Sequence, residues 1–181
     1  MSKYYTGNGD DGSSSIMSAS RMPKDDPIIE AIGEIDELNS SIGVAAFYIR
    51  EDEIRKELEN VQDDLFSAGA SLAYVLNHGA SRVEFGESKV QKLESLIDEM
   101  GESLPELKKF VLPGGSRASR YLHLSRSIAR RAERSVVHAS ATYKIEDSVR
   151  IYLNRLSSFL FVCALYINSE EGVTESNPRY G

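Results

Sequence analysis

Four arginines fall within nine positions in the segment RSIARRAERS, residues 126–135, although the formal net charge of the whole chain is −7. On a helix Arg126, Arg130 and Arg134 would share one stripe with Glu133 beside it, and like charges at this spacing repel. Arginine presents a rigid fork of donors that suits carboxylates and phosphates. The stripe borders a row of small residues, so we expect it to be partly buried and to need anions. These are either acids on another helix or the phosphates of a ligand; a solvated basic face is the alternative.

The N-terminal segment TGNGDDGSSS, residues 6–15, is a second candidate for phosphate binding. Its glycines expose backbone N–H groups, and its hydroxyls can donate to oxyanions. Asp10 or Asp11 could help to hold a magnesium ion, and Lys24 would add a point charge. The segment lacks the GK[ST] ending of a P-loop and follows no strand. Taken alone, a segment rich in Gly and Ser is more often a flexible tail.

Two polar residues stand beside apolar helical stripes. Asn154, in YLNRLSS, lies a turn around from the apolar face of its segment and alongside Phe161. Its amide is either a satisfied core group or a ligand contact. Asp36 directly follows Ile35, so we expect a partly buried carboxylate, which needs a partner. An arginine of the stripe is the obvious candidate.

Several kinds of enzyme site are excluded by residue type and spacing. The three histidines follow no metal-ligand pattern, and the paired Glu-x-x-His motifs of di-iron bundles do not occur. No serine or cysteine has an identifiable base that would make it a nucleophile. An enzyme with this sequence therefore needs a ligand that brings its own reactivity.

The elements that must position these residues are helices. Apolar or small residues recur at alternating spacings of three and four along residues 31–49, 54–75, 90–100, 122–139 and 149–167, which is typical of amphipathic helices. Ser116 is the predicted N-cap of the arginine helix. We predict an all-α fold, a five-helix bundle of the ferritin-like kind. The predicted parts are an N-terminal loop at 1–24, the bundle at 25–170 and a C-terminal tail at 171–181.

The amino-acid composition limits the number of domains, the use of disulfides and the cellular location that we expect. The chain has 181 residues, 41% of them hydrophobic, which is enough for one domain with a sizeable core. Its single cysteine excludes an intrachain disulfide framework. The longest apolar run, FLFVCALYI, is too short to span a bilayer, and the N-terminus lacks the apolar core of a signal peptide. We expect a cytoplasmic protein without a membrane partner. Nucleic-acid binding is also disfavoured, because the chain is acidic and has no aromatic platform among its arginines.

With these residues assembled, the chain resembles the PduO-type ATP:cob(I)alamin adenosyltransferases nearly from end to end. YYTGNGDDGSSS is similar to the family's phosphate loop, RMPKDDP to its basic segment, and GEIDELNSSIG to its G-x-x-D-E-L motif. FVLPGGS, LHLSRSIARRAER and YLNRLSSFLF follow in the family's order. The resemblance implies a homotrimer of five-helix bundles with active sites between subunits. It also implies transfer of the 5′-deoxyadenosyl group of ATP to cob(I)alamin, with release of triphosphate.

The resemblance further implies roles for individual residues. Asn154, Arg126, Arg130 and Glu133 would serve catalysis. Asp36 and Arg126 match a pair that bridges subunits beside the corrinoid, with Phe161 near it, and Phe110 matches the residue that displaces the lower ligand of cobalt. The ATP-binding set would be Thr6, Gly7, Asn8, Gly9, Asp10, Gly12, Ser13, Ser14, Ser15, Lys24, Arg130, Arg131, Glu133, Arg134 and Asn154.

The implied ligands are ATP with Mg²⁺, which its phosphates mainly hold, and cobalamin as substrate. The implied partners are a flavin-type reductant and an adenosylcobalamin-dependent enzyme. Gly7 and Asn8 depart from the family pattern, which usually has a basic residue first, and Ser158 stands where an aspartate is usual. The departure in the loop supports an alternative function, in which the protein has the same fold but is a non-catalytic carrier or sensor of ATP or corrinoid.

Overall fold

The computed structural model describes residues 4–16, 21–76 and 84–179. It confirms the five predicted helices, which are α1 (Pro27–Phe47), α2 (Asp52–Tyr74), α3 (Glu87–Glu102), α4 (Arg117–Ala139) and α5 (Asp147–Glu170). The predicted apolar stripes are buried along nearly their whole length, and only Val75 and Ile97 remain partly exposed. The short-range period of the sequence therefore predicts both the helices and the faces that they bury.

Local signals start the two helices that matter most for the site. Asp26 caps α1 by accepting a hydrogen bond from Ile28 N at 3.0 Å, and Pro27 takes a first-turn position where no N–H is needed. Ser116 caps α4 as predicted, because its side chain accepts a hydrogen bond from Ser119 N at 3.2 Å. Both caps satisfy backbone donors that a helix start would otherwise leave unpaired.

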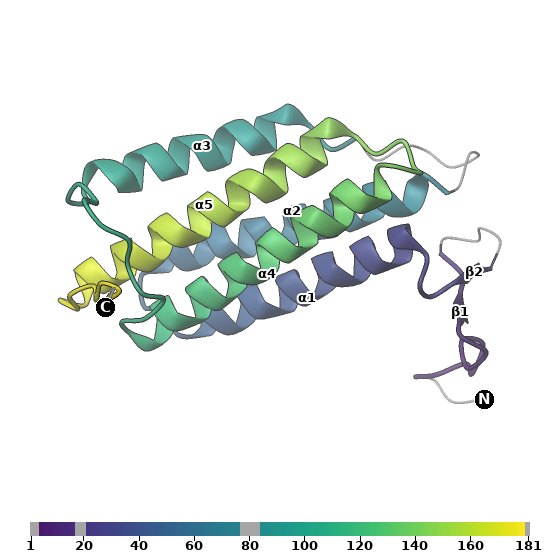
Figure 1. Ribbon diagram of the computed structural model, residues 1–181, viewed down its shortest axis with the longest axis horizontal. Helices are drawn as coiled ribbons and strands as arrows, with labels where there is room; N and C mark the ends of the chain where they lie inside the picture. The colour runs from purple at the N-terminus through teal and green to yellow at the C-terminus, as the bar shows by residue number, and fades with distance from the viewer. Residues whose placement is uncertain (1–3, 17–20, 77–83, 180–181) are drawn as a thin grey trace.

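Helix α4 lies at the centre of the bundle, between α1 and α5, while α2 packs on α1 and α3 packs on α5 (Figure 1). The inward face of α4 is rich in small side chains, with Ser125, Ala129, Ala132 and Ala139 fully buried. Small residues let neighbouring helices approach closely, so the long side chains of α4 are left for its outer surface. This arrangement directs the arginines away from the core.

A short hairpin precedes the bundle. Strand β1 (Ser13–Ser14) pairs antiparallel with β2 (Met22–Pro23), with Ser13 opposite Pro23 and Ser14 opposite Met22. The composition of residues 1–24 predicts only a loop here, because strands of two residues are too short to show an alternating pattern. The hairpin projects from the end of the bundle beyond the start of α1 (Figure 1).

Helix α5 is long and apolar enough to cross a membrane by length and composition alone. However, 61% of its most apolar stretch is buried inside the bundle, against α3 and α4. The core helix of a water-soluble bundle passes the same test. Its hydrophobicity is therefore explained by packing.

Candidate functional site

Glu133 on α4 is the centre of a polar cluster between α4 and α5. Its Oε1 accepts a hydrogen bond from Asn154 Nδ2 at 2.8 Å, and its Oε2 lies 3.1 Å from Arg130 Nη1. The second contact is an ion pair without hydrogen-bond alignment, so this buried oxygen retains acceptor capacity. The Glu133 side chain is only 16% exposed, whereas that of Arg130 is 49% exposed. Glu133 thus holds Asn154 and the guanidinium of Arg130 at one place on the surface.

The remaining arginines of the stripe differ in burial. Arg134 is exposed, and its Nη1 donates to the carbonyl of Arg130 at 2.9 Å. Arg126 is half-buried, and its Nε is buried without a hydrogen-bond partner in the described part of the chain. The expectation of a partly buried stripe is therefore correct for Arg126 and wrong for Arg130 and Arg134. Their long stems carry the charged heads past the small-residue face into solvent.

Arg131 turns toward α1. Its Nε donates to Glu34 Oε2 at 2.6 Å and its Nη2 donates to Glu37, and these two carboxylates raise its pKa. Asp36 lies between these two glutamates in the sequence but is exposed and forms no ion pair among the described residues. The expectation that Asp36 is partly buried is therefore wrong for a single chain, and its pairing with an arginine of the stripe stays a prediction. One position beyond the buried Ile35, the helix has already rotated its side chain out of the α1–α4 contact.

His123 is a buried residue near the stripe to which the sequence analysis assigns no role. It is 2% exposed, its ring centroid lies 6.0 Å from that of Phe161, and neither ring nitrogen has a hydrogen-bond partner among the described residues. Burial, with the nearby charge of Arg126, lowers its pKa, so it is neutral at pH 7. Its position one turn before Arg126 is the only signal that could have pointed to it.

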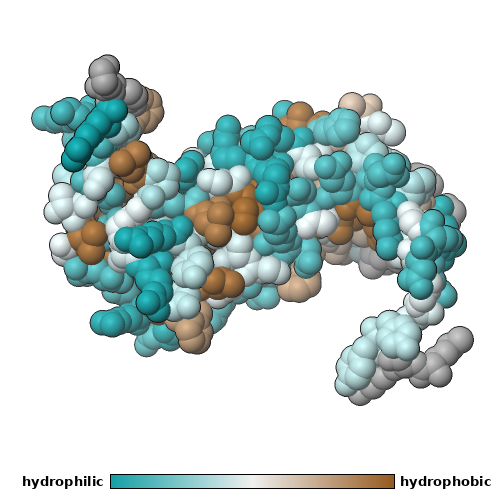
Figure 2. Space-filling model, turned by 60° about the horizontal axis from the view of Figure 1, so that its bottom comes forward, coloured by the Kyte–Doolittle hydropathy of each residue, from teal (hydrophilic) through white to brown (hydrophobic). Residues whose placement is uncertain are grey.

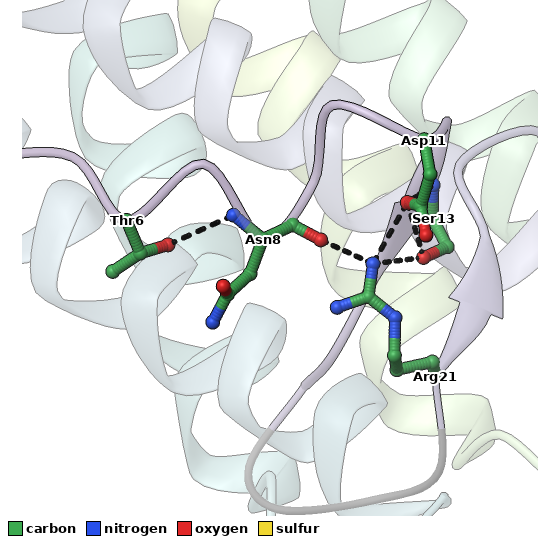
Figure 3. A network of polar contacts seen from close by, with 5 residues as sticks. All are labelled: Thr6, Asn8, Asp11, Ser13 and Arg21. Atoms are coloured by element: carbon green, nitrogen blue, oxygen red, sulfur yellow. Dashed lines mark hydrogen bonds and ion pairs between the residues drawn. The ribbon is translucent and has the colours of Figure 1, made fainter.

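The N-terminal loop, residues 4–16, folds on itself (Figure 3). Asn8 N donates to Thr6 Oγ1 at 3.3 Å, and both Ser13 N and Ser13 Oγ donate to Asp11 Oδ1, at 3.0 and 2.8 Å. These hydrogen bonds from Ser13, together with the charge of Arg21, lower the pKa of Asp11. The Asp11 carboxylate is therefore already bound by donors near it in the sequence.

Lys24 closes the base of this loop. Its backbone N donates to the carbonyl of Gly12 at 2.9 Å, and its Nζ lies 3.3 Å from the position that a Cβ at Gly9 would take. A side chain at residue 9 would displace the ammonium group. The structure therefore brings Lys24 against the glycines with which the sequence analysis grouped it. Ser14 lies in β1, and Ser15 directly follows it.

The N-terminal loop and the arginine stripe are separate within one chain. The hairpin extends from the end of the bundle, whereas Arg126 to Arg134 follow the body of α4 (Figure 1). Among the described residues, no hydrogen bond or ion pair joins residues 5–16 to α4. A single copy of the chain therefore presents the two predicted halves of a phosphate site on different surfaces.

The Phe110 loop, residues 103–116, lies at the other end of the bundle and is anchored by Asn168 of α5. Asn168 is fully buried, accepts from Ser116 N at 2.9 Å, and donates to Gly114 O at 3.4 Å and to Glu175 Oε1 at 2.8 Å. Gly115 has φ +100°, and a Cβ there would lie 2.2 Å from the Asn168 amide. This position therefore requires glycine.

The C-terminal tail also holds the Phe110 loop. Leu112 N donates to Ser176 O at 2.7 Å, and Asn177 Nδ2 donates to the carbonyl of Phe110 at 2.8 Å. Between the loop, the tail and the end of α5 lies a mainly apolar cavity of about 480 Å³, whose lining includes Leu107 and Leu165. Phe110 does not line it, and its ring is 80% exposed on the surface. A rigid backbone thus presents an apolar ring to solvent.

Taken together, the described residues offer cationic and hydroxyl donors for an anion and an exposed aromatic ring. No group of three or more His, Cys, Asp or Glu side chains within these residues is arranged to hold a metal ion. The arginine stripe can stabilise negative charge. The Phe110 ring can cover an apolar surface.

Comparison with known proteins gives one consistent result. The family described as cobalamin adenosyltransferase matches residues 4–167. The corrinoid adenosyltransferase of Citrobacter freundii is 42% identical over 167 residues, 91% of this chain and 94% of the relative. That of Bacillus subtilis (strain 168) is 39% identical over 175 residues, 94% of this chain and 89% of the relative.

Comparison with solved structures gives the same family as comparison with sequences. A variant of the PduO-type ATP:corrinoid adenosyltransferase from Lactobacillus reuteri, complexed with cobalamin and ATP, superposes with a TM-score of 0.93 at 36% identity, over 98% of this chain and 100% of that one. A second variant of that enzyme, complexed with ATP, has a TM-score of 0.90 at 36% identity, over 97% and 99% of the two chains.

Proposed function

The chain belongs to the cobalamin adenosyltransferase family, and on that premise we propose that it transfers the 5′-deoxyadenosyl group of ATP to the cobalt of a reduced corrinoid. The observation that carries the proposal is the cluster in which Glu133 joins Asn154 to Arg130. It supplies a positioned cation, Arg130, without a nucleophile or general base, and this reaction requires neither from the protein.

The corrinoid substrate brings the nucleophile, cobalt(I). It attacks C5′ of the ribose, the Co–C bond forms, the C5′–O bond breaks, and triphosphate leaves with the electron pair, so that cobalt becomes formally cobalt(III). The protein has to align these atoms and stabilise the charge on the departing triphosphate. Arg130 and Arg134 would do so, while Glu133 and Asn154 keep Arg130 in place.

Other residues bind and orient. Thr6, Ser13, Lys24 and the glycine amides of the N-terminal loop would hold the phosphates. Mg²⁺ bound by those phosphates would neutralise part of their charge, and the described residues fit this because Asp11 is already paired within the loop. Glu34 and Glu37 hold Nε and Nη2 of Arg131, so its Nη1, on a side chain that is 43% exposed, would be the group that reaches a phosphate.

We place each active site between subunits of a homotrimer. Supporting this, one chain keeps the N-terminal loop away from its own arginine stripe, so the stripe of a neighbour is the available partner. Exposed apolar side chains lie on two neighbouring helices, Val44 and Phe47 on α1 and Leu124 and Val137 on α4. Figure 2 shows apolar surface interrupting the polar face on this side of the bundle. The half-buried Arg126 and the exposed Asp36 would pair across that interface.

Phe110 would act on the corrinoid. An apolar ring beneath the macrocycle excludes a fifth ligand, and four-coordinate cobalt(II) is easier to reduce to the nucleophile. A flavin-type reductant would supply that electron in the cytoplasm, and an adenosylcobalamin-dependent enzyme would receive the product.

The first test is an anaerobic assay with chemically reduced cob(I)alamin and Mg–ATP that follows light-sensitive adenosylcobalamin. Wild type forms product, and Arg130→Ala lowers kcat about 100-fold, the cost of losing a donor to developing charge. Arg150→Ala is the matched control, because its side chain is also 49% exposed and also pairs with an acid three positions away. ATP binding without product would instead favour the non-catalytic carrier or sensor.

A second assay isolates Phe110. Phe110→Ala should impair adenosylation that starts from cob(II)alamin and a flavin reductant more than adenosylation from cob(I)alamin. Phe66→Ala, which removes an exposed ring from α2, should change neither. Equal losses in both assays would remove Phe110 from the reduction step.

A further inference from the structure

Arg21 is a charged residue that the proposed mechanism leaves unused. It follows the N-terminal loop in the sequence, and its Nη2 approaches three oxygens of that loop (Figure 3). These are Asp11 Oδ1 at 2.7 Å, the carbonyl of Asn8 and the hydroxyl of Ser13. One guanidinium nitrogen thus ties the middle of the loop to the start of β1.

The charge of the loop explains why a cation is needed there. Residues 4–16 contain two carboxylates, Asp10 and Asp11, and no lysine or arginine. A loop with two negative charges repels a triphosphate by Coulomb's law. Arg21 neutralises Asp11 at 2.7 Å, and Lys24 adds a second cation beside Gly9. The two cations together offset the two carboxylates.

Arg21 also has N–H groups that its contacts with the loop do not use. A guanidinium has five N–H groups, of which Nη2 carries two. Its Nη1 and Nε have no hydrogen-bond partner among the residues that the structure describes, and its side chain is 43% exposed. In Figure 3 both of these nitrogens lie on the side of the guanidinium away from Asp11 and Ser13. A phosphate can be bound there without breaking the contacts of Nη2.

We propose that Arg21 is an ATP-binding residue of this chain, which holds the N-terminal loop through Nη2 and donates to the triphosphate through its remaining N–H groups. The assignment rests on the proposed function and deepens it, because it names the cation that makes an acidic loop able to accept a polyanion. A lysine would do both less well, since its three N–H groups share one nitrogen and cannot face the loop and the phosphate from opposite sides of a planar group.

Calorimetric titration of the full-length protein with Mg–ATP tests the assignment. Arg21→Ala should weaken binding about 10- to 100-fold, the loss expected for a charge-assisted hydrogen bond, and Arg21→Lys should fall between Arg21→Ala and wild type. The matched control is Arg55→Ala on α2, which removes the same charge from a side chain of 40% exposure that pairs with Asp52. Arg21→Ala that binds as tightly as Arg55→Ala would overturn the proposal.

Two comparisons separate phosphate binding from a purely structural role. The double variant Arg21→Ala/Asp11→Asn should recover only part of the affinity that Arg21→Ala loses; full recovery to the affinity of Asp11→Asn would mean that Arg21 only neutralises Asp11 and would overturn the phosphate contact. Arg21→Ala should also weaken ATP binding more than AMP binding. Equal losses for both nucleotides would indicate a general loosening of the loop and overturn the triphosphate contact.

The wild-type controls keep this inference distinct from the proposed function. Wild type that binds ATP but transfers no adenosyl group refutes the transferase, while the Arg21 variants still decide the ATP contact. Wild type that binds no ATP refutes both. Wild type that binds and transfers, with an unaffected Arg21→Ala, refutes the inference alone.

Discussion

The two loops that carry the proposed substrate contacts are held in opposite ways. The Phe110 loop is tied to the bundle by a fully buried amide, Asn168, whose partners are backbone groups of the loop and Glu175 in the tail. The N-terminal loop is tied to its own hairpin by an exposed arginine, Arg21, whose partners are also exposed. Both loops contain a glycine with positive φ. They differ instead in the burial of the side chain that anchors them.

This contrast predicts different behaviour. A hydrogen bond inside the core is lost only when the core opens, and its unpaired remnants are costly there. An exposed ion pair contributes little to stability and competes with water and salt. The Phe110 loop should therefore be part of the cooperatively folded bundle, while the N-terminal loop should depend on its ligand.

Gly115→Ala should give the largest change in stability. The new Cβ would be strained at φ +100° and would overlap the Asn168 amide at 2.2 Å, so the free energy of unfolding should fall by about 3 kcal/mol. Urea denaturation followed by circular dichroism measures it. Gly12→Ala is the matched control, because it places the same side chain at φ +81° with nothing within 4 Å, in the other loop. Equal losses of unfolding free energy in the two variants would contradict the proposed difference between the two loops.

Asn168→Ala should be the next in size. It leaves the N–H of Ser116 without its buried partner, while the carbonyl of Gly114 keeps the hydrogen bond from Ser119 Oγ at 2.9 Å, so we expect a loss of about 2 kcal/mol in the free energy of unfolding. Arg21→Ala, measured in the same way, should leave the urea midpoint unchanged. A stable Asn168→Ala protein would mean that the tail alone holds the Phe110 loop.

Tyr143→Phe should have a smaller effect, at the boundary between the N-terminal loop and the bundle. The Tyr143 hydroxyl donates to Asp26 Oδ2 at 2.9 Å, while Oδ1 of the same carboxylate caps α1. Removing one part-buried hydrogen bond should cost about 1 kcal/mol of unfolding free energy. An effect as large as that of Asn168→Ala would extend the rigid part of the molecule into the base of the N-terminal loop.

Hydrogen exchange should distinguish the loops without changing their stability. The amide of Ser116, bonded to the buried Asn168 Oδ1 at 2.9 Å, should exchange slowly, and that of Lys24, bonded to Gly12 O at 2.9 Å, should exchange fast. Saturating Mg–ATP should slow exchange at Lys24 and leave Ser116 unchanged. Slow exchange at Lys24 in the free protein would mean that the N-terminal loop is already formed.

Much of the architecture could be predicted from the sequence because helix periodicity is a short-range property. The apolar spacing of each helix, the Ser116 cap and the small face of α4 depend on residues within one or two turns of one another. The same reasoning grouped Lys24 with the glycine loop and Glu133 with the arginines, and the structure brings both groups together.

Contacts across the chain had to come from the tertiary structure. Ser116 and Asn168 are 52 positions apart, and no local pattern marks Asn168 as the anchor of the Phe110 loop. The direction of Arg131 toward Glu34 and Glu37, and the exposure of Asp36, follow from how α1 and α4 are rotated against each other. The sequence by itself determined which helices form and which faces they bury, because those depend on neighbours along the chain. Only the tertiary structure decided where the long charged side chains end and that the N-terminal loop stands apart from the arginine stripe, because both depend on how separate elements pack.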